Sequence, residues 1–168
     1  MHDNPLAYFI TWTCYGTWLP GDERGWTKWH KGMRSSRPQL CEWIRQRLDE
    51  SPVTLSFPQR VAVGDAISEC CRRRGWRLHA ANCRSNHCHV VATAINHLGE
   101  VVRDQLKAWS TRSLRAIERE SGLPESQLRR HWWSSKGSVR QVDTLESLEA
   151  AIVYTNDAQD LGGSTQNE

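Results

Sequence analysis

The chain has 168 residues, nine of them tryptophan, and no run of about 18 apolar residues that would cross a membrane. This length favours one domain with a substantial core, and the aromatic content excludes a disordered chain. Residues 1–142 hold all 22 Lys and Arg against 13 acidic residues, whereas residues 143–168 hold six acidic residues and neither Lys nor Arg. A basic body of this kind is compatible with a polyanionic partner and equally with a solvated basic surface.

Residues 1–94 predict three strands and a helix, with a long excursion. Residues 7–17, AYFITWTCYGT, are rich in aromatic and β-branched residues and predict a strand. Residues 20–55 show no clear period, so we expect a loop or excursion with a short helix over about 41–49. A helix begins after Ser56 and ends before Gly75. Residues 76–83 and 87–94 then predict two strands joined by a short turn.

The second half predicts two helices and a further strand. Apolar residues recur at helical spacing from Leu98 to Ile117. Residues 132–140 predict two short extended pieces around a Lys-Gly turn. The last helix is expected to begin at Asp143, with Glu146 at capping-box spacing, and to run to about residue 160 before a disordered tail over 161–168.

The order strand, helix, strand, strand, helix, strand predicts an α+β fold with a ferredoxin-like, or split βαβ, antiparallel sheet. Residues 1–160 would form this single domain, with 20–55 as an excursion within it. Helices would cover one face of the sheet, and an added C-terminal helix would follow. The other face would be left for a ligand.

The segment RSNHCHVVATA, residues 84–94, places His87 and His89 two positions apart on a predicted strand. Residues two apart point to the same face, so the histidines project together while Cys88 faces the opposite way. This arrangement suits two imidazoles on one divalent cation, and it also suits two polar residues on an exposed sheet. The pair alone is incomplete as a metal site. Zinc bound by Cys83, His87, Cys88 and His89 is a further hypothesis, against which the direction of Cys88 argues.

Tyr154 stands apart from the other tyrosines. In the last predicted helix Leu145, Leu148 and Ile152 form the apolar stripe, and Tyr154 falls nearly opposite to it. A tyrosine turned away from its helix's packing stripe is available to a cleft. An ordinary half-exposed tyrosine fits the same pattern.

Together, YFITWTCYGTWLPGDERGW, SNHCHVV, HWWSSKGSVRQV and VYTNDAQ resemble the single-tyrosine transposases of the HUH superfamily. They are similar to the REP-associated tyrosine transposases and related bacterial insertion-sequence transposases over about residues 7–160. The resemblance implies an endonuclease and strand transferase for single-stranded DNA, often at hairpins, that forms a 5′-phosphotyrosine intermediate without ATP. His87 and His89 match the histidines that bind Mg²⁺ or Mn²⁺, and Tyr154 matches the nucleophile.

The third metal ligand departs from the family pattern. The family usually carries Gln or Asn four residues after the tyrosine, where this chain has Ala158. The resemblance favours Gln159 as the ligand, whereas ideal helical geometry favours Asp157 because it lies closer to Tyr154 around the helix. Without a third ligand, the alternative is a catalytically weakened module of the same fold that binds single-stranded nucleic acid.

Several residues are candidates for DNA contacts, and each also has a structural interpretation. Arg24 and Lys28 lie on the family-like WLPGDERG loop or just after it, and Trp132 would stack on bases beside Lys136 and Arg140. The resemblance implies single-stranded or hairpin DNA as the partner, and no association with a membrane is expected. Monomer and homodimer both remain open. The expected location is the cytoplasm, with association to the nucleoid when DNA is bound.

Overall fold

The computed structural model describes residues 4–28 and 32–157. Four strands form one antiparallel sheet in the order β4-β5-β1-β6. Their bounds are Ala7–Thr13 for β1, Arg77–Cys83 for β4, His87–Thr93 for β5 and Ser138–Val142 for β6. The first strand along the chain therefore lies between the third and the fourth of the sheet, which is the predicted split βαβ arrangement.

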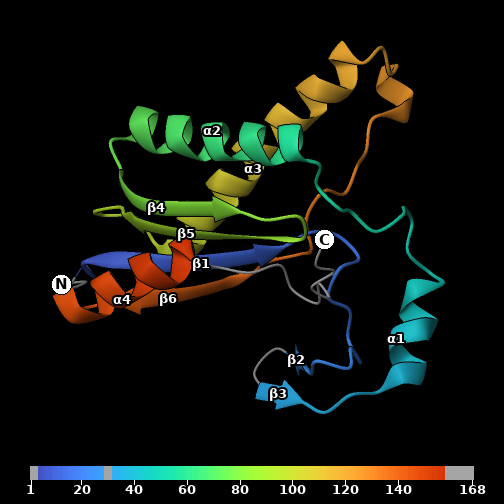
Figure 1. The fold of residues 1–168 in the computed structure, drawn as a ribbon, viewed down its shortest axis with the longest axis horizontal. Helices are drawn as coiled ribbons and strands as arrows, with labels where there is room; N and C mark the ends of the chain where they lie inside the picture. The colour runs from blue at the N-terminus through green and yellow to red at the C-terminus, as the bar shows by residue number, and fades with distance from the viewer. Residues whose placement is uncertain (1–3, 29–31, 158–168) are drawn as a thin grey trace, which may run out of the picture.

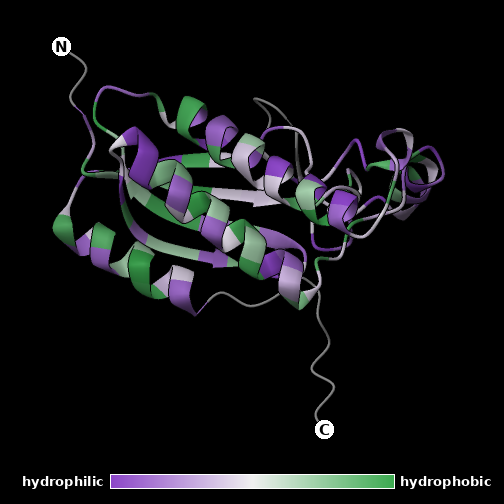
Figure 2. Cartoon of the chain, turned by 90° about the horizontal axis from the view of Figure 1, so that it is seen from above, coloured by the Kyte–Doolittle hydropathy of each residue, from purple (hydrophilic) through white to green (hydrophobic). Residues whose placement is uncertain are grey.

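Helices α2 (Phe57–Arg74) and α3 (Gly99–Glu120) pack against each other on one face of the sheet (Figure 1). The sequence signals at the ends of α2 are confirmed. Ser56 caps its start in a capping box with Gln59, and Gly75 ends it with a φ of 67°. Viewed from above, these helices alternate hydrophobic and hydrophilic residues, as expected for helices with one buried side (Figure 2).

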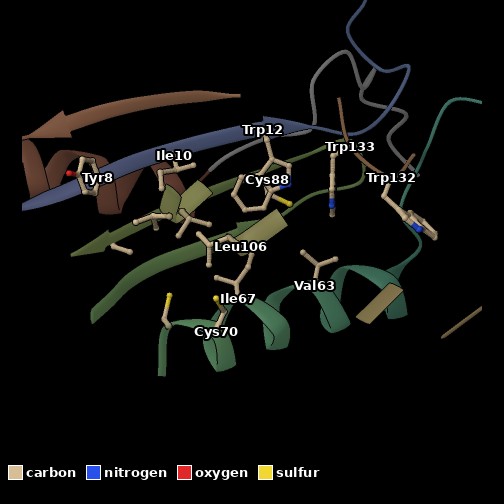
Figure 3. Close-up of a cluster of buried hydrophobic side chains, with 14 of the residues drawn as sticks. Tyr8, Ile10, Trp12, Val63, Ile67, Cys70, Cys88, Leu106, Trp132 and Trp133 are labelled. Carbon is tan, nitrogen blue, oxygen red and sulfur yellow. The ribbon is translucent and has the colours of Figure 1, made fainter. Parts of the chain in front are cut away.

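The main core lies between the sheet and these two helices (Figure 3). From β1 it takes Ile10 and Trp12, which are 0% and 1% exposed. The connection before β6 adds Trp132 and Trp133, both buried in the same cluster. The prediction that Trp132 stacks on bases does not fit this position, because its ring faces protein rather than solvent.

The opposite face carries a smaller cluster under α4 (Leu145–Asn156), which joins Ala7, Val91 and Val142 to Ala151. Helix α4 contacts only β4 and β5 extensively, so it covers part of this face and leaves the rest open. Its cap is Thr144, whose side chain accepts a hydrogen bond from the Ser147 amide. The predicted start at Asp143 was therefore one residue early.

The predicted excursion contains a hairpin and a helix that lie apart from the four-stranded sheet, toward the lower right of Figure 1. The hairpin pairs β2 (Trp26–Lys28) with β3 (Gly32–Arg34). Helix α1 spans Pro38–Arg45, earlier than the predicted 41–49, because Pro38 favours the first turn of a helix. A short 3₁₀ turn, η1 (Glu125–Gln127), follows α3. Among the described residues, no helix has the length and apolar character needed to cross a bilayer.

Candidate active site on the open face of the sheet

His87 and His89 lie side by side on β5, on the sheet face that α2 and α3 do not cover. Their ring centroids are 4.6 Å apart, and the rings are nearly perpendicular. Cys88 between them is fully buried in the main core. The prediction that both histidines share a face while Cys88 points away is therefore confirmed. Both imidazoles are largely buried, at 0% and 6% exposed, so they form the floor of a site rather than a solvated surface pair.

Each imidazole is oriented by a hydrogen bond at Nδ1. The Nδ1 of His89 lies 2.8 Å from the Thr11 hydroxyl on β1, and the Nδ1 of His87 lies 2.8 Å from the side-chain oxygen of Asn86. An amide oxygen only accepts, so Nδ1 of His87 carries the proton, and in the neutral imidazole Nε2 carries the lone pair. Histidines that bind metals are commonly oriented in this way by outer partners.

Burial lowers the pKa of His89, which keeps its imidazole neutral at neutral pH. A neutral imidazole is the form that coordinates a cation. Thr11 pairs with His89, and Thr13 pairs with His87, across the β1–β5 ladder. The polar residues of β1 therefore face the same space as the histidines.

Tyr154 reaches this space from α4. Its ring centroid lies 5.4 Å from that of His89, and the residue is 59% exposed. The Phe9 ring contacts both of these rings. Its centroid lies 5.6 Å from that of His89 in a stacked arrangement and 5.9 Å from that of Tyr154 in an edge-on arrangement. The predicted orientation of Tyr154 away from the packing stripe agrees with this position. Leu145 does not belong to that stripe, because it is 70% exposed at the first turn of α4.

The end of α4 is attached to the sheet by Asn82. Its amide nitrogen lies 2.9 Å from the Thr155 carbonyl and 3.4 Å from the Asn156 carbonyl. Asn82 is on β4, directly opposite His89 on β5. The carbonyls in the last turn of a helix lack donors within the helix, and a side-chain amide can satisfy them. The strand beside the histidines thus holds the turn that carries Tyr154.

The two histidines and Tyr154 line a cleft of about 440 Å³, which lies within the size range of ligand pockets. Phe9, Thr11, Trp18 and Asn82 were not predicted as site residues. The alternation of β1 would have pointed to Phe9 and Thr11 once its pairing with β5 was known. The residues that line the cleft are Phe9, Thr11, Thr13, Trp18, His87, His89, Ser138, Arg140 and Tyr154.

The predicted third ligand is not among the described groups at this site. Gln159 lies outside the described residues. Asp157 is exposed at the C-cap of α4, and the described part of the chain holds no cluster of three or more His, Cys, Asp or Glu residues suited to a metal. Asp157 therefore does not complete the site. The zinc hypothesis also fails on geometry, because the Cys88 sulfur turns to the Cys83 sulfur at 3.3 Å in the core.

The predicted DNA-contacting residues divide by position. Arg140 lines the cleft, with its guanidinium 5.1 Å from the Phe9 ring centroid. Arg24 is paired with Asp22 at 2.7 Å, and Lys28 is the last residue of β2. Lys136 lies in the turn before β6 with a φ of 67°, and its carbonyl accepts a hydrogen bond from Lys107.

No protein-family model matches the chain, and no curated protein matches it. Among solved structures, the chain is similar to a crystal structure of a "putative transposase" from Deinococcus radiodurans. The two share 14% sequence identity over 90% of each chain, with a TM-score of 0.45. Chains this far apart in sequence and shape give no basis for assigning a function, which must come from the site itself.

Proposed function

We propose that this protein is a metal-dependent endonuclease and strand transferase for single-stranded DNA, of the HUH single-tyrosine transposase type. The observation that carries the proposal is the meeting of Tyr154 with His89 and His87 in one cleft, from a helix and a strand that are far apart in the chain. The cleft thus brings together Tyr154 as a nucleophile, His87 and His89 as metal ligands, and the positively charged side chain of Arg140.

The donor set fits a divalent cation. His87 and His89 would hold Mg²⁺ or Mn²⁺ through Nε2, because Nδ1 of each is engaged by Asn86 or Thr11. Gln159, three residues beyond the end of α4, is the proposed third ligand. A bound cation would neutralise a phosphate oxygen and polarise the phosphorus as a Lewis acid. Two nitrogen ligands are softer than Mg²⁺ prefers, which favours Mn²⁺.

The chain's own groups account for the transfer step. The Tyr154 oxygen attacks the phosphorus of a DNA phosphodiester and forms a new phosphorus–oxygen bond, while its phenolic proton passes to water. The bond from phosphorus to the 3′-oxygen breaks, and that oxygen takes a proton to become a 3′-hydroxyl. The 5′-phosphate stays on Tyr154 until a 3′-hydroxyl attacks it and reverses the step, so bond energy is conserved and ATP is not needed.

Single-stranded DNA is the proposed substrate because the tyrosine must reach a phosphate inside a cleft lined by aromatic rings. Arg140 beside Phe9 supplies positive charge near Tyr154, where a phosphate would lie. Helix α4 packs on β4 and β5 of its own chain. This packing supports a tyrosine supplied in cis, so that a single chain can hold a complete set of these groups.

The test is incubation of the purified protein with Mn²⁺ and a pool of labelled single-stranded and hairpin oligonucleotides. A covalent protein–DNA band is expected with the wild type and is absent with Tyr154→Phe. His87→Ala should lose the band while retaining DNA binding. Equal DNA affinity in the wild type and Tyr154→Phe, with no covalent band across the pool, would instead identify a binding module of the same fold.

A further inference from the structure

Trp18 lies on the loop after β1 and borders the cleft together with His87 and Tyr154. The residue is half-buried. The indole nitrogen donates a hydrogen bond of 2.6 Å to the Gly25 carbonyl. The chemistry described above for the histidines and Tyr154 makes no use of this ring.

Arg24 supports the ring from one side. Its guanidinium carbon lies 5.2 Å from the Trp18 ring centroid. Two hydrogen bonds of 2.7 Å tie that guanidinium to the Asp22 carboxylate, which is 8% exposed, and a third of 3.0 Å joins it to the Thr17 carbonyl. Arg24 hydrogen bonding also lowers the pKa of the Asp22 carboxyl, so the pair stays ionised.

The loop itself is built to hold this arrangement. Gly21 and Gly25 have φ values of 89° and 85°, which side chains rarely adopt. A Cβ at Gly21 would collide with the Arg37 carbonyl. The backbone is therefore folded tightly around the Asp22–Arg24 pair, with Trp18 presented at the edge of the cleft.

We infer that Trp18 is a stacking platform for one base of the bound strand, next to the phosphate held at Tyr154. This inference rests on the proposed function and adds the part of the substrate that the platform binds. An indole backed by a guanidinium is a strong surface for a nucleobase, since stacking and cation–π attraction add together. Arg140 would contact the phosphate and Trp18 would stack on the base, so that both parts of one nucleotide are bound.

Stacking accepts every base, because each has an aromatic face. The platform is therefore expected to supply affinity and placement rather than sequence choice. It also requires an unpaired base, which selects single strands over duplex DNA. Loss of one such contact raises Kd by about 5- to 150-fold.

The experiment measures binding in a Tyr154→Phe background, so that cleavage plays no part. The probe is a fluorescein-labelled, mixed-sequence single strand of 12 nucleotides, and Kd is read by anisotropy. Trp18→Phe and Trp18→Leu both lose the hydrogen bond to Gly25, but only the first keeps an aromatic face. Trp43→Ala is the matched control, because Trp43 is 54% exposed on α1 with the Arg47 guanidinium 4.0 Å from its ring and does not line the cleft.

The expected result is a Kd that rises 5- to 150-fold for Trp18→Leu, stays within about threefold for Trp18→Phe, and does not change for Trp43→Ala. Equal weakening by both Trp18 variants would overturn the inference, since a purely structural role for the indole hydrogen bond predicts that outcome. Unchanged affinity in both would overturn it as well. In either case a Tyr154-linked adduct formed by the wild type would leave the proposed function standing.

A second measurement uses strands carrying 5-iodouracil, which cross-links to a stacked aromatic ring on irradiation. Mass spectrometry should place the cross-link on Trp18. Cross-links confined to other residues would contradict the platform. A cross-link at Trp18 with no adduct at Tyr154 in the wild type would support the platform and reject the transfer reaction, whereas no binding to any strand would reject both.

Discussion

Replacing Asn82 with alanine should release the end of α4 that carries Tyr154. The Asn82 amide donates to the Thr155 and Asn156 carbonyls at 2.9 and 3.4 Å, and Thr155 is fully buried. A hydrogen bond contributes about 0.5–1.5 kcal/mol net, and the longer of the two contributes less. The docking of the last turn should therefore weaken by about 1–2 kcal/mol, which lowers its docked population relative to the open form by about 5- to 30-fold.

Two assays follow this change. Amide hydrogen exchange in the last turn of α4 should speed up while exchange in β1 and β5 stays the same, and the rate of adduct formation should fall with little change in DNA affinity. Asn82→Asp should be worse than alanine, because it loses the donor and places a negative charge at a helix C-terminus. Asn4→Ala serves as a control, since the partner of its side-chain amide within residues 4–28 and 32–157 is the exposed Asn96. Unchanged exchange and adduct rates in both Asn82 variants would refute this role for Asn82.

Three further predictions concern the orientation of a ligand, the pH dependence of stability and the core. Thr11→Val removes the partner of His89 Nδ1 and should weaken Mn²⁺ binding by about 10- to 100-fold in calorimetry, and unchanged affinity would contradict the assigned orientation. Burial raises the pKa of Cys71 to about 12. The neutral thiol therefore contributes fully to the stability of the folded state below about pH 9, and this contribution is lost as the pH rises toward 12. The urea midpoint should fall over this range, and it should fall less steeply in Cys71→Ala. Leu106→Ala should cost about 2–5 kcal/mol in urea unfolding, whereas Val61→Ala, at a 46% exposed position, should cost much less.

The fold could be predicted because each element carries a local signal. The helix cap at Ser56, the glycine stop at Gly75 and the alternation around His87 are short-range patterns, and the structure agrees with all three. The side of α4 on which Tyr154 lies also follows from helical periodicity alone. These signals placed the two histidines on one face of their strand and turned Tyr154 away from its packing stripe, whereas only the family resemblance brought the three residues together.

The remaining site residues depend on pairing between distant segments. Asn82 meets Thr155 across 73 residues, and Phe9 meets His89 only through the β1–β5 register. No local pattern contains that information. Trp132 was placed wrongly for a related reason: the segment makes only an isolated bridge between Cys14 and Trp133, so the alternation of a regular strand does not apply. The path of the backbone over residues 20–55 could not be predicted, because it depends on glycines with positive φ.

The central claim is that Tyr154 is the nucleophile, and mass spectrometry of the protein–DNA adduct tests it most directly. After incubation with Mn²⁺ and a cleavable single strand, digestion should yield one modified peptide, with a 5′-phosphorylated nucleotide on Tyr154 and a free 3′-hydroxyl on the released fragment. A nucleotide attached to Tyr8 or Tyr15, or an adduct that persists in Tyr154→Phe, would contradict the account.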